Sequence, residues 1–240
     1  MTEPERPSGP VVVVADATEA PARVLERLRL PPLRRTVVVN GGTREGTERD
    51  TRLDTMFGHL LTVLPSDSLL LTGGTEAGVF VNVGRAAGTV GFGGPVVGVA
   101  PAGRVAHGPI GDDRTGATGG RLHDVEEHHT HVVAVRGEEF GEETPMMVAL
   151  TAALATRMPL VVVLVGGGDI SRREIEPALA AGRHVVALHG TGRLADELAA
   201  RTPQPSGLHL ADIGAPDTAA AMIAGLVGVP TSGGARSRPS

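Results

Sequence analysis

The sequence predicts a single α/β domain with a Rossmann-like, doubly wound and mainly parallel sheet that carries helices on both faces. Three observations predict it. Short apolar runs rich in β-branched residues recur along the chain, as in strands that are buried on both faces. Segments with helical apolar spacing follow these runs, which is the pattern of right-handed βαβ units. The length of 240 residues fits one such domain.

The apolar runs set the expected strands. These span 11–14, 36–39, 68–71, 96–100, 131–135, 160–165 and 184–188. Helices are expected at 20–28, 47–63, 78–88, 144–157, 171–181, 194–201 and 218–226. In the second of these segments the apolar side chains share one face, which is typical of an amphipathic helix that packs on a sheet.

The ends of the chain differ in composition from its middle. Residues 1–10 are polar and rich in proline, and we expect a flexible arm there. Residues 11–230 form the predicted domain, and residues 231–240 have the composition of a flexible tail. The stretch 103–130 is rich in glycine, aspartate and histidine and is long for a loop in a compact domain. Loops of this length are usually functional or mobile.

Several residue types are missing, and their absence excludes whole classes of chemistry. The chain has no Cys, Trp, Tyr or Lys. A disulfide scaffold, a thiol nucleophile, a Schiff-base lysine and a lysine-containing phosphate loop are therefore excluded. No G-x-G-x-x-G fingerprint occurs, so a hydride-transferring dehydrogenase is not expected.

Net charge and hydropathy limit the cellular locations and the classes of partner that we expect for this protein. The net charge is −5, which gives no electrostatic footprint for nucleic acid. No apolar run approaches the roughly 20 residues that span a bilayer, and the first residues do not resemble a secretory signal. We expect a cytoplasmic protein that binds neither nucleic acid nor membrane.

Glycine is clustered where four predicted strands end. Glycine makes up 34 of 240 residues, about 14% against a usual ~7%. The clusters are 40–43, 72–75, 166–169 and 190–193. The carboxyl edge of an open α/β sheet is where ligands bind, and the helix N-termini that follow suit phosphate groups. The alternative is that these are tight turns that need glycine only for their geometry.

The clusters supply the first set of candidate ligand-binding residues. They are Gly41, Gly42, Thr43, Gly73, Gly74, Thr75, Gly166, Gly167, Gly168, Asp169, Ser171, Gly190, Thr191, Gly192 and Arg193. Helix capping alone would also explain Asp169 and Ser171. Glu76 is a candidate for ribose hydroxyls or a simple first-turn acid, and Arg85 is a phosphate ligand or an exposed helix residue.

A histidine tract and an acidic run leave alternatives open. His128, His129 and His131 could hold a metal, line a ligand site or serve the start of a strand. Nothing else in the sequence fixes a third ligand, so we expect no metal, and only His131 is counted among the ligand-binding residues. The glutamates at 138, 139, 142 and 143 read as a solvated face or a helix start, with a divalent-ion role as the alternative.

The motifs together resemble one superfamily. The segments 70–80, 83–86 and 96–103 resemble the SLOG superfamily, the group of Smf/DprA and LOG proteins. The closer match is to the SLOG domain at the N-terminus of TRPM-type cation channels, in a stand-alone prokaryotic form. The Asn-Gly-Gly-Thr turn at 40–43, the Glu-His-His-Thr-His segment at 127–131 and the span 159–196 fit that variant. The resemblance covers residues 34–202.

This resemblance implies a Rossmann-like domain that binds nucleotides or signals derived from them. In the channel branch, ADP-ribose and related molecules are ligands of some members. The matching motifs add Gly78, Val79, Ala100 and Pro101 to the ligand-binding candidates. No cofactor is implied beyond the nucleotide ligand, and LOG-like proteins are commonly dimers, so a homodimer is expected from the resemblance alone.

The enzymatic LOG branch is matched more weakly and gives the alternative function. Its motif Pro-Gly-Gly-x-Gly-Thr-x-x-Glu falls on 166–174, with Gly166 for the proline, Ile170 for the third glycine and Ser171 for the threonine. These departures put turnover in doubt, not ligand binding. Cleavage of an N-glycosidic bond needs a carboxyl group near the ribose carbon, and Glu174 would supply it.

Two functions follow as expectations. The first is a sensor for an adenine nucleotide derivative such as ADP-ribose, in which the ligand favours closure of segment 103–130. The second is a phosphoribohydrolase or NAD glycohydrolase with Glu174 as its catalytic carboxylate. A scaffold without a ligand is the third alternative.

Overall fold

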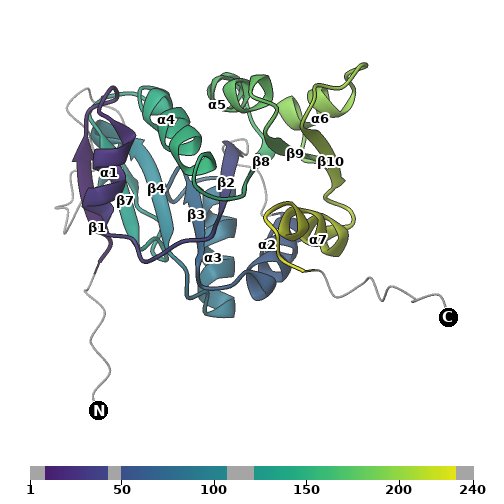
Figure 1. Ribbon diagram of the computed structural model, residues 1–240, viewed down its shortest axis with the longest axis horizontal. Helices are drawn as coiled ribbons and strands as arrows, with labels where there is room; N and C mark the ends of the chain where they lie inside the picture. Colours follow the sequence, from purple (N-terminus) through teal and green to yellow (C-terminus); the bar gives the residue numbers. More distant parts are fainter. Residues whose placement is uncertain (1–8, 43–49, 107–121, 231–240) are drawn as a thin grey trace, which may run out of the picture.

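One parallel sheet organises the protein. The computed structural model describes residues 9–42, 50–106 and 122–230. Within these residues eight parallel strands form the main sheet, in the order β1-β7-β4-β3-β2-β8-β9-β10 (Figure 1). The strands are β1 (Val11–Ala15), β2 (Arg35–Gly42), β3 (Ser68–Thr72), β4 (Val96–Pro101), β7 (His131–Val135), β8 (Leu160–Gly166), β9 (His184–His189) and β10 (Leu208–Asp212).

Helices cover both faces of this sheet, so the predicted fold class is confirmed (Figure 1). The helices are α1 (Pro21–Leu28), α2 (Thr51–Val63), α3 (Val79–Val90), α4 (Thr144–Ala155), α5 (Asp169–Ala180), α6 (Arg193–Ala199) and α7 (Pro216–Leu226). None of the helices in the described ranges is long and apolar enough to cross a membrane.

Alternating side chains of the strands divide the interior into two cores. On β2, Val38 packs in the core that α1, α4, α5 and α6 cover. Its neighbours Val37 and Val39 pack in the core that α2, α3 and α7 cover. Because every β2 residue from Thr36 to Asn40 is buried, the strand reads as a continuous apolar run rather than an alternating one.

The direction in which successive strands are added to the sheet reverses at β2 and β8, which are parallel neighbours at the middle of the sheet. From β2 the chain passes through α2 to β3, on one side of this pair. From β8 the chain passes through α5, which lies on the sheet face opposite to α2. It then reaches β9, which pairs with β8 on the side away from β2. Such a reversal opens a crevice at the carboxyl ends of the two strands, which is the usual ligand position in open α/β sheets.

Three features differ from the sequence-based expectation. The strand β2 continues to Gly42, because its pairing with β8 runs as far as Gly166. The helix expected from residue 47 begins at Thr51, where the Asp50 carboxylate accepts a hydrogen bond from the Arg52 N–H. Strand β10 was not expected, because its sequence lacks a continuous apolar run.

The stretch 103–130 is partly regular. A 3₁₀ turn at Ala102–Arg104 leads into β5 (Val105–Ala106), which pairs in parallel with β6 (His123–Asp124). Residues 107–121, on which most of the expected closing segment falls, lie outside the described residues. The expected arm at 1–8 and the tail at 231–240 lie outside them as well.

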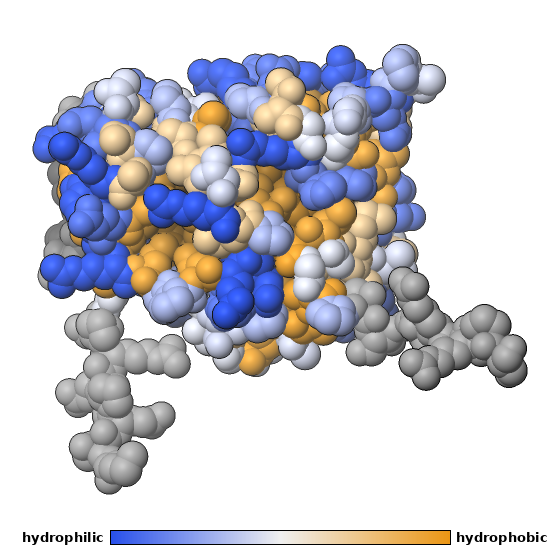
Figure 2. Space-filling model, viewed as in Figure 1, coloured by the Kyte–Doolittle hydropathy of each residue, from blue (hydrophilic) through white to orange (hydrophobic). Residues whose placement is uncertain are grey.

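A hollow marks the face that carries α1 and α4. Figure 2 shows apolar side chains exposed beside these two helices. A space of about 400 Å³ lies there, between the residues that follow α1, such as Leu30 and Pro31, and Leu154 of α4 with Met158 just after that helix. It lies apart from the carboxyl edge of β2 and β8.

Candidate functional site

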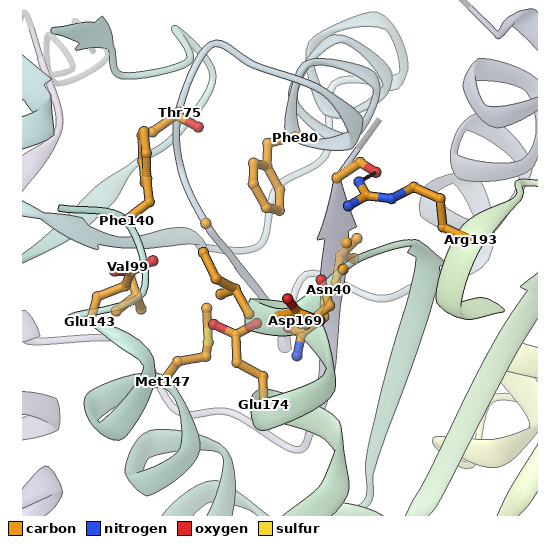
Figure 3. A pocket seen from close by; sticks show the side chains of 17 residues that line it. Asn40, Thr75, Phe80, Val99, Phe140, Glu143, Met147, Asp169, Glu174 and Arg193 are labelled. Atoms are coloured by element: carbon orange, nitrogen blue, oxygen red, sulfur yellow. Dashed lines mark hydrogen bonds between the residues drawn. The ribbon is translucent and has the colours of Figure 1, made fainter. Parts of the chain in front are cut away.

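A cavity of about 270 Å³ occupies the crevice at the switch between β2 and β8 (Figure 3). Its floor comes from the end of β2, and its walls come from the starts of α3, α4 and α5 and from the loop after β7. Nine of the sequence-predicted residues line it: Gly41, Gly42, Gly73, Thr75, Gly168, Asp169, Ser171, Glu174 and Arg193. The structure thus brings residues from all four glycine clusters to one place.

Gly41 lets β2 run close beside β8. Its φ is 146°, a conformation that L side chains rarely adopt. A Cβ atom on Gly41 would collide with the carbonyl oxygen of Val165. This glycine is therefore needed for strand pairing at the floor of the cavity, independently of any ligand.

One end of the cavity carries a cation at a helix N-terminus. The guanidinium of Arg193 lies against the Cα of Gly168, where a Cβ would collide with Nη2. Its Nη1 atom donates to the Gly42 carbonyl oxygen at 3.4 Å. Within the described residues no carboxylate forms an ion pair with Arg193. The helix α5 starts at Asp169, and the first N–H groups of a helix have no partner inside it.

Arg193 also has an uncommon backbone conformation. Its φ of 53° lies in the left-handed region, where non-glycine residues are infrequent. Such residues persist where the surroundings hold them, and they cluster at functional sites. The conformation places an exposed cation beside the cavity.

The turn from β9 to α6 uses its own polar groups. The N–H groups of Gly190 and Gly192 donate to the two carboxylate oxygens of Asp196, at 2.6 and 3.2 Å. The Thr191 hydroxyl donates to the Leu188 carbonyl oxygen and accepts from the Gly166 N–H. Of the residues predicted for this turn, only Arg193 lines the cavity. A phosphate on these glycines would have to displace Asp196.

Two carboxyl groups lie on one wall (Figure 3). Glu174 is half-buried on α5, and Glu143 is buried just before α4. Burial, together with the charge of Glu143, raises the pKa of Glu174 to about 8. Burial also raises the pKa of Glu143. At neutral pH the Glu174 carboxyl is therefore mostly protonated, and it can donate a proton into the cavity.

The sequence did not single out Glu143. It stands last in the acidic run 138–143, which reads as a solvated face, yet it is only 7% exposed. Its Oε2 atom accepts a 2.7 Å hydrogen bond from the Gly141 N–H, which turns the side chain inward. The weak signal for this burial is the position at the start of an apolar helix.

A polar atom on the cavity floor also has no partner. Asn40 is 3% exposed, and among the described residues its Oδ1 atom makes no hydrogen bond. Buried polar groups nearly always find a partner. Asn40 lines the cavity, so a hydroxyl or amino group of a ligand would supply the missing donor.

The turn after β3 rests on a buried polar network. The Thr72 hydroxyl accepts from the Gly74 N–H at 2.9 Å and contacts Nε2 of His129 at 2.7 Å. Nδ1 of His129 lies 2.9 Å from Glu126. Burial alone would raise the pKa of Glu126, but the hydrogen bonds from His129 and His128 lower it. This histidine therefore supports the loop that carries Thr75.

A separate hollow receives several other predicted residues. Exposed Glu76 and partly exposed Arg85 line a space of about 330 Å³ beside β6. The Arg85 guanidinium lies 3.5 Å from Asp54 of α2. Potential metal-ligand atoms of Glu126, Glu127 and His128 lie within 4.8 Å of one another there. The Glu126 carboxylate already accepts hydrogen bonds from both neighbouring histidines.

The remaining predicted residues lie away from the cavity. His131 is the first residue of β7, at the amino edge of the sheet, where it lines a different hollow and contacts Thr130. Six others are built into turns, strands or a helix start without lining the cavity: Gly74, Gly78, Val79, Ala100, Pro101 and Gly166. Gly167 follows the end of β8 and donates its N–H to the Gly42 carbonyl oxygen without lining the cavity, and Thr43 lies outside the described residues.

Comparison with protein families identifies the fold family. Residues 34–225 match the family described as "SLOG in TRPM, prokaryote". The chain belongs to this family. The match begins just before β2 and ends in α7, so every residue that lines the cavity lies within the matched part of this SLOG domain. The elements β1 and α1 precede the match. The family resemblance seen in the sequence is confirmed.

No curated protein matches the SLOG domain. The X-ray structure of TM1055, a target of the Northeast Structural Genomics Consortium, is 21% identical. The alignment covers 75% of this chain and 92% of that chain, with a TM-score of 0.48.

Proposed function

We propose that this SLOG domain binds a nucleotide, of the adenine type exemplified by ADP-ribose, in the switch-point cavity. The observation that carries the proposal is the Arg193 guanidinium against the start of α5. A helix N-terminus with its free N–H groups and positive dipole end favours phosphate, and a guanidinium can bind it in a fork. Asn40 and the carboxyl of Glu174 are then available for ribose hydroxyls.

The size of the cavity bears on the ligand. Its volume of about 270 Å³ lies just below the usual range of ligand pockets, which is roughly 300–1,000 Å³. We expect the cavity to enclose one nucleoside phosphate unit. The second half of a larger ligand such as ADP-ribose would extend beyond Arg193.

Thermal unfolding tests this proposal. The protein is heated with and without AMP, ADP-ribose, cyclic ADP-ribose and NAD. A ligand at about 100 times its Kd adds roughly 2.7 kcal/mol, which is several degrees for a domain of this size. Arg193→Gln should abolish the rise, whereas Arg201→Gln, an exposed arginine after α6, should preserve it. No rise with any of the four compounds contradicts the proposal.

A second candidate function is hydrolysis of the N-glycosidic bond of the bound nucleotide. The raised pKa of Glu174 favours it. The Glu174 carboxyl would give its proton to the departing base nitrogen as the bond to the ribose carbon breaks. Water would add to that carbon and lose a proton to the carboxylate of Glu143.

Chromatography for released base tests this second function. Glu174→Gln should stop release while binding persists, because glutamine cannot donate an acidic proton. Glu176→Gln, an exposed residue on the same helix, is the matched control. If the wild-type protein binds the nucleotide and releases no base, the hydrolysis function is wrong and only the binding function stands.

A further inference from the structure

Two of the few aromatic rings in this chain line the cavity. The protein has four phenylalanines and no Trp or Tyr. Phe57 is 1% exposed in the core under α2, and Phe92 lies near the amino edge of the sheet. Phe80 and Phe140 both line the switch-point cavity. Half of the aromatic side chains are thus placed at one site.

The ring of Phe80 is fixed by its neighbour in the preceding turn. Phe80 is the second residue of α3, and it packs against the core beneath that helix. A Cβ atom on Gly73 would lie 2.5 Å from Cε2 and Cζ of the ring. The absence of a side chain at Gly73 therefore leaves the space in which the ring forms part of the cavity wall.

The loop after β7 places the ring of Phe140 in the lining of the cavity. Phe140 is 41% exposed, which is uncommon for a large apolar side chain. The loop is tied by Glu142, whose Oε2 atom accepts from the N–H groups of Glu138 and Glu139 at 2.6 and 3.3 Å. The ring meets His123 edge-on, with centroids 5.4 Å apart. Its position is thus fixed although the ring stays partly exposed.

The two ends of the cavity differ in character (Figure 3). In this view Phe140 and Arg193 lie on opposite sides, and Glu174 lies below and between them. One side therefore presents a flat apolar surface and the other a cation, with carboxyl groups along the wall that joins them.

We infer that Phe140, with Phe80 as the second aromatic ring of the cavity wall, binds the planar base of the ligand, so that base, ribose and phosphate lie in line from Phe140 to Arg193. This inference rests on the proposed nucleotide function and adds its base-binding residue. Aromatic side chains bind bases by stacking and tolerate different bases, because every base has a π-face. The ligand class is therefore a base-bearing sugar phosphate, and a sugar phosphate without a base binds weakly.

Two substitutions test the inference by binding. Phe140→Ala should weaken AMP about tenfold to a hundredfold, the usual cost of losing one stacked base. The same change should leave the much weaker binding of ribose 5-phosphate unaltered, because that compound reaches only the Arg193 end. Phe92→Ala is the control and should bind both compounds as the wild type does. Calorimetric titration measures all three proteins.

A fluorescent version reports the contact directly. The Phe140→Trp variant contains one tryptophan, and its emission should be quenched when AMP binds and unchanged by ribose 5-phosphate. The single tryptophan of Phe92→Trp should not respond to either compound. This readout also serves if Phe140→Ala folds poorly.

The outcomes separate the two proposals. If wild-type protein binds AMP and Arg193→Gln does not, while Phe140→Ala binds AMP normally and the tryptophan is silent, the base lies elsewhere and the present inference is wrong. If the wild type binds none of the nucleotides, the proposed function fails, and the base-binding role of Phe140 fails with it.

Discussion

The side chains of Thr72 and His129 are joined by a 2.7 Å contact between Oγ1 and Nε2, where β3 leads into the turn before α3. The carboxylate of Glu126 accepts the Nδ1 proton of His129, so Nε2 accepts the hydroxyl proton of Thr72 when the ring is neutral. The Thr72 oxygen in turn accepts from the Gly74 N–H. A chain of hydrogen bonds thus fixes the loop that carries Thr75 to the cavity.

Removal of His129 should destabilise the fold. His129→Leu keeps most of the buried volume but takes one donor from the buried Glu126 carboxylate. We expect a loss of about 3 kcal/mol in the free energy of unfolding, measured in urea. His59→Leu, at an exposed position on α2, should change it by less than about 0.5 kcal/mol. Equal unfolding midpoints for the two variants would contradict the network.

The raised pKa of Glu174 predicts a pH dependence of stability. Its carboxyl has a pKa of about 8 in the folded protein and an ordinary value of 4.5 in the unfolded chain. The unfolded chain therefore loses this proton first, and stability falls as pH rises from about 4.5 to 8. The difference between the two pKa values corresponds to at most about 5 kcal/mol above pH 8, and solvent around this half-buried side chain lowers that figure.

Urea unfolding at pH 5.5 and 8.5 checks this dependence. Glu174→Gln, which stays neutral, should lose less stability over this range than the wild type and should be the more stable protein at pH 8.5. Glu176→Gln should follow the wild type, because this side chain is exposed. Parallel pH curves for Glu174→Gln and the wild type would show that Glu174 is ionised at neutral pH.

Gly41 and Gly58 should respond oppositely to alanine. Gly41→Ala places a Cβ against the Val165 carbonyl at a φ of 146°, so we expect a loss of at least about 4 kcal/mol or a failure to fold. Gly58 lies inside α2 with nothing within 4 Å of a new Cβ, and alanine there should stabilise the protein by up to about 1 kcal/mol. The yield of folded protein and the urea midpoint measure both. A stable Gly41→Ala protein would show that β2 and β8 separate at this point.

The Asp196 carboxylate should hold the turn after β9. Asp196→Ala leaves the N–H groups of Gly190 and Gly192 without their acceptor, and we expect a loss of about 1–2 kcal/mol. Glu197→Ala removes only a surface ion pair with Arg172 and should cost less than about 1 kcal/mol. The two urea midpoints should differ in that order. If they do not, the turn is held by its backbone alone.

Most of the architecture follows from local sequence patterns. The buried strands were predictable because each is a continuous apolar run, as in β8. The edge strand β10 escaped because His209 interrupts its apolar residues and Asp212 ends them, so no continuous apolar run marks it. The end of β2 escaped because glycine normally marks a turn, whereas Gly41 and Gly42 here pair with β8.

The site was predictable only as an edge of the sheet. That Gly42, Gly168 and Arg193 lie together follows from strand order, which βαβ logic constrains. The burial of Glu143 depends on how the loop after β7 folds back over the sheet, and no local pattern encodes this. The same holds for Phe140, whose isolated position in an acidic run gives no sign that it faces a cavity.

The position of the cavity at the seam between the two cores has a mechanical consequence. Met147 belongs to the layer above one face of the sheet, and Phe80 packs against the layer below the other. A bound ligand would contact Met147 and Phe80 at the same time and would link the two helix layers. Amide hydrogen exchange should then slow together in α3 and α4, which the sheet otherwise keeps apart. Ligand binding on one edge of the sheet would thus make the helices on both of its faces more rigid.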